Sequence, residues 1–176
     1  VGEPEVLRPL AEREPCAVVF GGRERRKRVY TALRDEKHGV GKNLDRLGIR
    51  EIIDIGPELE SPSKVAGCVV KPLGKRPAEE VSALLADSRV GFIDYPGHVF
   101  SKSGIAAAYF AHRVLTVNTS SVAGLPPALE EGHQFVSLAS FVQQNFAPQA
   151  VADAGLAWYR PHNVAATGRM VAEQLL

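Results

Sequence analysis

Residues 16–30 read CAVVFGGRERRKRVY, so that an apolar run and a basic run meet at two adjacent glycines. The first five residues form a continuous apolar run, which is typical of a strand covered on both faces. From Glu24 to about Glu36, Val29, Tyr30 and Leu33 recur at helical spacing. A strand, a glycine turn and a helix in this order predict the first part of a β-α-β unit.

The same alternation continues along the chain. Four more apolar runs predict strands at 51–55, 67–70, 90–94 and 114–118. Helical patterns occupy 78–87, 104–112, 137–155 and 161–176. Strands alternating with helices predict the α/β class, a Rossmann-like three-layer α/β/α fold with a mostly parallel sheet.

The link between the strands at 51–55 and 67–70 fits this scheme poorly. It contains two prolines and shows no helical period. A crossover between parallel neighbours normally takes a dozen or more residues and a helix. Either this crossover lacks a helix, or one of the two runs is not a strand of the sheet.

Composition narrows the class of protein. The chain has 176 residues, 45% hydrophobic and 23% charged, which is typical of a soluble globular domain. Its net charge of +1 predicts no general attraction to nucleic acid or to a membrane. Cys16 and Cys68 lie in apolar stretches and are interpreted as buried, reduced thiols, and no metal site is expected from their spacing.

The ends of the chain suggest its setting. Residues 1–15 are polar and rich in proline, so we interpret them as linker-like, with 16–176 as one domain. No apolar run reaches the roughly 18 residues of a membrane span, and the opening does not resemble a signal peptide. Because the chain starts at Val1, we expect a fragment of a longer cytoplasmic protein.

The first candidate site is the glycine turn and the basic run after it. Glycine allows a backbone to approach a phosphate closely, and the start of a helix presents free N–H groups. Arginine can bind two phosphate oxygens at once. The alternative is a solvated basic helix face. The candidate residues are Gly21, Gly22, Arg23, Lys27 and Arg28.

The second candidate site follows the strand at 90–94, where ligands of open α/β sheets bind. Serine here could cap the next helix, and a lysine near the positive end of that helix favours a bound anion. The alternative is an ordinary helix cap, and a lone histidine is more often structural than catalytic. The candidate residues are Tyr95, His98, Ser101, Lys102, Ser103 and Gly104.

The third candidate site follows the strand at 114–118 and offers the small polar side chains of Asn118, Thr119 and Ser120. The alternative is a Ser/Thr turn. Because carboxyl ends of parallel strands share one edge, the three loops are expected to line a common cleft.

Taken in order, five segments resemble the C-terminal, nucleotide-sugar-binding domain of GT-B-fold glycosyltransferases, closest to the group 1 or family-four-like retaining enzymes. The resemblance covers nearly the whole chain, and the order and spacing of the segments are its specific part. The segments are VVFGGRERRKRVY (18–30), AEEVSALLADSRVGFIDYP (78–96), FSKSGIAAAYFAHRVLTVNTS (100–120), SSVAGLPPALEEGHQFV (120–136) and HNVAATGRMVAEQLL (162–176).

The resemblance implies transfer of a sugar from a nucleotide-diphosphate sugar, with no other cofactor, in a cleft shared with an N-terminal acceptor domain. Arg23 and Lys27 or Arg28 would neutralise the leaving diphosphate, assisted by Lys102. That absent domain could also associate with a membrane surface; no nucleic-acid partner is expected.

The chain departs from the family at one pair of positions. The two glutamates of the family would fall near Phe100 and Ala108, and neither is acidic. No catalytic residue is therefore assigned. Two alternatives stay open: a nucleotide-sugar epimerase of the same fold, and a catalytically inactive GT-B-like binding module.

Overall fold

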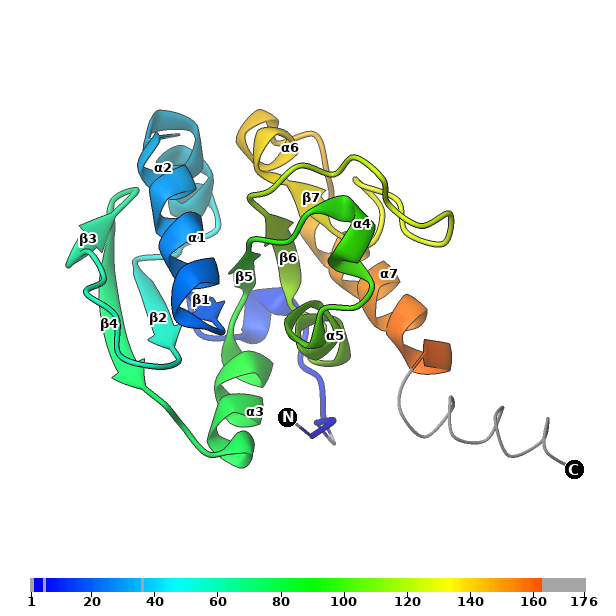
Figure 1. Ribbon diagram of the computed structural model, residues 1–176, viewed down its shortest axis with the longest axis horizontal. Helices are drawn as coiled ribbons and strands as arrows, with labels where there is room; N and C mark the ends of the chain where they lie inside the picture. The colour runs from blue at the N-terminus through cyan, green and yellow to red at the C-terminus, as the bar shows by residue number, and fades with distance from the viewer. Residues whose placement is uncertain (1, 5, 36, 163–176) are drawn as a thin grey trace, which may run out of the picture.

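A seven-stranded sheet forms the centre of the computed structural model, which describes residues 2–4, 6–35 and 37–162 (Figure 1). The strand order is β3-β4-β2-β1-β5-β6-β7, and every neighbouring pair is parallel except β3 and β4. The mostly parallel sheet predicted from the sequence is confirmed. The strands are β1 (Cys16–Phe20), β2 (Glu51–Ile55), β3 (Lys64–Val65), β4 (Cys68–Gly74), β5 (Val90–Ile93), β6 (Leu115–Asn118) and β7 (Val136–Ser137).

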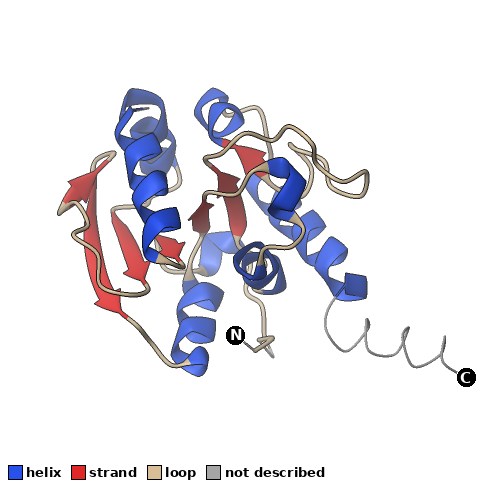
Figure 2. Ribbon diagram, in the orientation of Figure 1, coloured by secondary structure: helices blue, strands red, loops and turns tan. Residues whose placement is uncertain are grey.

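Helices cover both faces of this sheet and complete the three layers (Figure 2). One apolar core lies between the sheet and α1, α2, α6 and the first turns of α7, and the other lies between the sheet and α3, α4 and α5. As predicted, Val29, Tyr30 and Leu33 form the buried face of α1. The helices are α1 (Arg23–Asp35), α2 (Lys37–Arg46), α3 (Ala78–Asp87), α4 (Gly97–Phe100), α5 (Gly104–Ala111), α6 (Leu138–Gln143) and α7 (Pro148–Tyr159), with short 3-10 turns at Leu10–Glu12 and Arg160–His162.

Helix α2 was not predicted, and it contains two glycines, which are unfavourable inside a helix. Both glycines serve close packing instead. A Cβ on Gly39 would lie 2.2 Å from Val142 of α6, and one on Gly41 would lie 3.0 Å from the carbonyl oxygen of Ala66. Buried Val40 and a buried amide at Asn43, which donates to Phe141 O at 2.8 Å, hold α2 in place.

The unusual link between β2 and β4 is a crossover without a helix. Both runs are strands of the sheet and pair in parallel. Part of the link turns back as β3, which pairs antiparallel with β4 through Val65 and Cys68. Between them, Ala66 and Gly67 both have positive φ, as a two-residue type I′ hairpin requires.

The chain reverses its direction of growth across the sheet between β1 and β5. From β1 it builds outward through β2 to β4, then returns to β5 and builds the other way through β6 to β7. In open α/β sheets, ligands bind outside the carboxyl ends of strands at such a switch point. Here those ends are Phe20 and Ile93.

The C-terminal helical pattern at 137–155 divides into two helices. Helix α6 ends where Gln144 adopts the left-handed conformation, and α7 begins with Pro148 in its first turn. The last predicted helix, 161–176, lies almost entirely outside the described residues, which stop at His162. Among the described residues, none of the helices combines the length and the hydrophobicity that a membrane span requires.

Two residues shortly before β1 are packed against the rest of the chain. Leu10 and Arg13 are both buried. Arg13 Nη1 donates to the carbonyl oxygens of Ser88 at 3.1 Å and His112 at 2.9 Å. These contacts fix the entry into β1 at the amino edge of the sheet, opposite to the switch point.

Candidate functional site

The diglycine turn at the end of β1 lies at the switch point and is tightly constrained. Gly21 has a φ of +137°, and a Cβ at this position would lie 2.4 Å from Cδ1 of Ile105 in the first turn of α5. Its N–H donates to Ile55 O at 3.0 Å. Gly22 is exposed and immediately precedes α1. The turn therefore brings the start of α1 beside the start of α5.

The side chain of Arg26 fixes this turn through a hydrogen bond to its backbone. It is buried and donates to Gly21 O at 3.0 Å and to Asp54 Oδ1 at 2.6 Å, and it also donates to Pro57 O. Asp54 is equally buried, in β2. One member of the basic run is thus committed to a structural ion pair.

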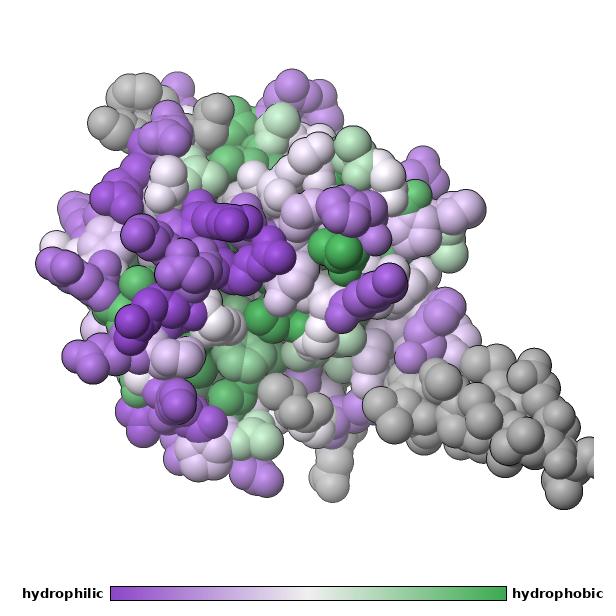
Figure 3. Space-filling model, viewed as in Figure 1, coloured by the Kyte–Doolittle hydropathy of each residue, from purple (hydrophilic) through white to green (hydrophobic). Residues whose placement is uncertain are grey.

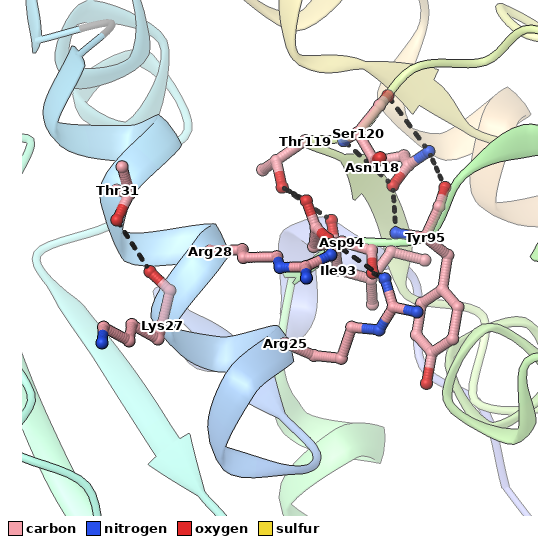
Figure 4. Close-up of polar contacts among 10 residues, drawn as sticks. All are labelled: Arg25, Lys27, Arg28, Thr31, Ile93, Asp94, Tyr95, Asn118, Thr119 and Ser120. Atoms are coloured by element: carbon pink, nitrogen blue, oxygen red, sulfur yellow. Dashed lines mark hydrogen bonds and ion pairs between the residues drawn. The ribbon is translucent and has the colours of Figure 1, made fainter.

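Two other arginines of α1 point toward the carboxyl end of β5, where Asp94 lies (Figure 4). Arg25 Nη1 donates to Asp94 O at 3.0 Å and to Asp94 Oδ1 at 3.3 Å. The Arg25 guanidinium also lies over the ring of Tyr95, 4.6 Å from its centroid. Arg28 Nη1 approaches the same carboxylate oxygen at 3.9 Å. We call Gly21, Gly22, Arg25, Arg28, Asp94, Tyr95, Asn118, Thr119 and Ser120 the switch-point site.

The loop after β6 completes this site and fixes residues 93–95. Asn118 Oδ1 accepts from Tyr95 N at 3.0 Å, and its Nδ2 donates to Tyr95 O at 2.8 Å. Thr119 Oγ1 lies 3.1 Å from Ile93 O and 3.3 Å from Asp94 Oδ2. Ser120 N approaches Asn118 Oδ1 at 3.4 Å. The polar groups of Asn118 and Thr119 are thus used within the chain.

The SKSG loop, residues 101–104, combines a helix cap with an exposed cation. Ser103 is buried and caps α5, because its Oγ accepts from Ala106 N at 3.1 Å. Ser101, Lys102 and Gly104 are exposed. Nearby, His98 of α4 is exposed and its Cβ lies beside Gly124.

The remaining two predicted basic residues lie elsewhere on α1. Arg23 Nε donates to Glu58 O at 2.9 Å, toward the loop after β2. Lys27 points away from Asp94 and is exposed (Figure 4). Hydrophilic side chains gather densely over α1 in Figure 3. The cations of α1 therefore point in different directions: Arg25 and Arg28 toward β5, Arg23 toward the loop after β2, and Lys27 into solvent.

A cavity of about 430 Å³ lies on the Arg23 side of the turn, outside the carboxyl ends of β2 and β4. It adjoins the turn, because a Cβ on Gly56 would lie 2.2 Å from Gly21 O. Its size falls in the range of small-molecule sites. The lining residues are Arg26, Asp54, Gly56, Pro57, Glu58, Leu59, Pro72, Gly74 and Lys75.

The buried side chain of Tyr109, from α5, packs against β1 and β5. Its hydroxyl accepts from Phe20 N at 3.1 Å and lies 3.3 Å from the carbonyl oxygens of Val18 and Phe92. A Cβ on Gly91 would lie 2.4 Å from the Tyr109 ring, so only glycine fits there. Burial raises the pKa of Tyr109, and the phenol stays neutral.

The two positions that carry glutamates in the resembled family are part of the apolar core. Phe100 is fully buried and stacks on Phe135, with ring centroids 4.3 Å apart. Ala108 is buried in α5. Within the part of the chain that the structure describes, no group of three His, Cys, Asp or Glu side chains is placed to hold a metal ion.

Arg25 and Asp94 were not among the predicted site residues. The basic run includes Arg25, but only the rotation of α1 shows which cations face β5. Asp94 was interpreted as the end of a strand. Comparison with models of known protein families and with curated proteins finds no match to this chain.

Proposed function

We propose that this chain binds a nucleotide-diphosphate sugar at the switch-point site and acts as the donor-binding half of a glycosyltransferase. The observation that carries the proposal is the diglycine turn, which has two arginines on its β5 side and a cavity on its β2 side. Such a ligand has three parts, and the arrangement offers a place for each.

The diphosphate would lie across the glycine turn. Gly22 is exposed and has no Cβ to block a phosphate, and the first N–H groups of α1 face outward from the helix start. Arg25 and Arg28 can each donate to phosphate oxygens from the β5 side. In a transfer reaction they would stabilise the negative charge that develops on the leaving diphosphate.

The nucleoside would occupy the cavity of about 430 Å³ on the other side of the turn. Glu58 and Lys75 provide polar groups at its wall, and Leu59, Pro57 and Pro72 provide apolar surface for a base. A few polar groups among apolar walls are typical of small-molecule sites. The sugar would then lie toward β5, β6 and the SKSG loop.

Catalysis needs groups beyond those that bind the diphosphate. Phe100 and Ala108 are apolar and buried, and Asp94 is engaged by two arginines. We therefore propose that turnover requires an acceptor-binding domain, and that this chain alone binds donor without transferring its sugar. The same observation favours a second candidate, a nucleotide-binding module without catalytic activity.

Calorimetric titration with UDP, GDP and ADP tests the proposal. One of the three should bind, and Arg28→Ala should weaken that binding by about tenfold to hundredfold, as expected for loss of a charge-assisted hydrogen bond. Lys27→Ala is the matched control, because Lys27 is a neighbouring cation that points away from the site. Lys102→Ala reports whether the SKSG loop takes part.

Absence of binding to all three nucleotides would refute the proposal. If Arg28→Ala and Lys27→Ala lose the same amount of nucleotide affinity, the loss reflects the overall positive charge of α1 and not a contact made by Arg28. An activity assay with the acceptor-binding domain present separates the two candidate functions. Transfer or hydrolysis of the sugar, detected by chromatography of the sugar nucleotide, would favour the glycosyltransferase, and its absence would favour the inactive nucleotide-binding module.

A further inference from the structure

Arginines of helix α1 contact two aspartates, and the two sets of contacts differ in kind. Arg26 and Asp54 lie 2.6 Å apart, with side chains 3% and 1% exposed. Arg25 and Asp94 lie 3.3 Å apart, with side chains 33% and 10% exposed, and Arg28 is 3.9 Å from the same carboxylate. Charge-assisted hydrogen bonds are normally about 2.7–2.9 Å long, so the contacts of Asp94 are loose. The first pair is structural, and the second can open.

The position of Arg25 does not depend on the Asp94 carboxylate. Its guanidinium lies over the Tyr95 ring at 4.6 Å and donates to the backbone carbonyl of Asp94 at 3.0 Å. Both contacts remain if the carboxylate turns away. The guanidinium is therefore already oriented for another anion.

The carboxylate has a second partner to which it can turn. Asp94 Oδ2 lies 3.3 Å from Thr119 Oγ1, in the loop after β6. Rotation toward Thr119 would release the Oδ1 contacts with both arginines while keeping one hydrogen bond. A ligand phosphate could then take the place of Oδ1.

We propose that Asp94 is an internal competitor for the anion site: it occupies Arg25 and Arg28 in the free chain and is exchanged for the phosphate oxygens of the ligand. This inference rests on the proposed function for the identity of the ligand, but the exchange itself concerns any diphosphate. It predicts that Asp94 lowers affinity for diphosphates and screens the two arginines from weaker anions.

The test compares Asp94→Asn with wild type by calorimetry, using inorganic pyrophosphate and each of UDP, GDP and ADP at 0.05 and 0.15 M salt. Removing the competing carboxylate should tighten pyrophosphate binding by about threefold to thirtyfold, because it frees two arginines whose side chains are 33% and 63% exposed. Asp45→Asn is the matched control, because it removes the same charge from an exposed pair with Arg50 at the opposite edge. It should leave binding within about twofold of wild type.

Unchanged or weaker pyrophosphate binding in Asp94→Asn would overturn the inference. A measurement on the wild-type chain does not depend on how the variant folds: the Arg25 and Arg28 Nε–H resonances should shift on addition of pyrophosphate. If they stay in place, the exchange does not occur.

Failure of the inference and failure of the proposed function give different results. If Asp94→Asn tightens pyrophosphate binding but none of UDP, GDP and ADP binds better than pyrophosphate, the exchange holds and the nucleotide proposal fails. If one of the three nucleotides binds strongly and Asp94→Asn tightens neither that nucleotide nor pyrophosphate, the proposed function holds and the exchange is wrong. If neither pyrophosphate nor any of the three nucleotides binds either protein, both are wrong.

Discussion

Replacement of Arg26 by methionine should strongly destabilise the fold, although Arg26 belongs to an otherwise exposed basic run. Its side chain is 3% exposed and pairs with Asp54, which is 1% exposed, at 2.6 Å. Removing one member of a buried pair leaves an uncompensated charge and costs about 3–5 kcal/mol. Since a domain is stabilised by about 5–15 kcal/mol in total, Arg26→Met should lose a large share of its free energy of unfolding.

Urea unfolding followed by far-UV circular dichroism measures this loss. Arg28→Met is the control on the same helix: its side chain is 63% exposed and its nearest carboxylate oxygen is 3.9 Å away, so it should lose less than about 1 kcal/mol. The double variant Arg26→Met/Asp54→Leu should recover at least half of the loss, because both charges are gone. A loss below about 1 kcal/mol in Arg26→Met would refute the reasoning.

Three further predictions concern the buried interior. Gly91→Ala should lose about 1–3 kcal/mol in the free energy of unfolding, because the new Cβ would lie 2.4 Å from the Tyr109 ring; a change under about 0.5 kcal/mol would contradict this. Burial lowers the pKa of His112 below its ordinary 6.5, so the unfolded chain binds more protons than the folded chain as the pH falls below that value. The free energy of unfolding should therefore be highest above pH 6.5 and decrease below it. His112→Gln should remove this dependence on pH. Cys16 and Cys68 are buried thiols with raised pKa, so alkylation at pH 7.5 should be at least about 100-fold slower than in urea; comparable rates would show that the thiols are accessible.

The fold was largely predictable because its strongest signals are local. Continuous apolar runs mark β1, β2, β4, β5 and β6, and helical spacing marks α1, α3 and α5. Helix α2 was hidden because Gly39 and Gly41 are explained only by contacts with Val142 and Ala66, which are distant in sequence. The short strands β3 and β7 have two residues each and carry no periodic signal.

The sequence predicts which loops lie at the candidate site, but not the role of each residue in it. The parallel order of strands brings the loops after β1, β5 and β6 to one edge. There the loops after β5 and β6 are joined by hydrogen bonds between Tyr95 and Asn118, and the glycine turn after β1 meets Ile105 of α5. Which cation serves which purpose depends on the rotation of α1: Arg26 turns inward, Arg25 and Arg28 face Asp94, and Lys27 faces solvent. Adjacent basic residues in a sequence do not reveal this division.

An NMR map of backbone amide shifts, recorded during titration with each of UDP, GDP and ADP, tests the central claim most directly. If the diphosphate lies across the diglycine turn, the largest shifts should fall on Gly22, Arg25 and Tyr95, at the carboxyl edge of the sheet. A different cavity of about 500 Å³ lies at the amino edge and is lined by Leu47 and Leu115 among others. Shifts centred there, with the glycine turn unchanged, would contradict a nucleotide site at the switch point.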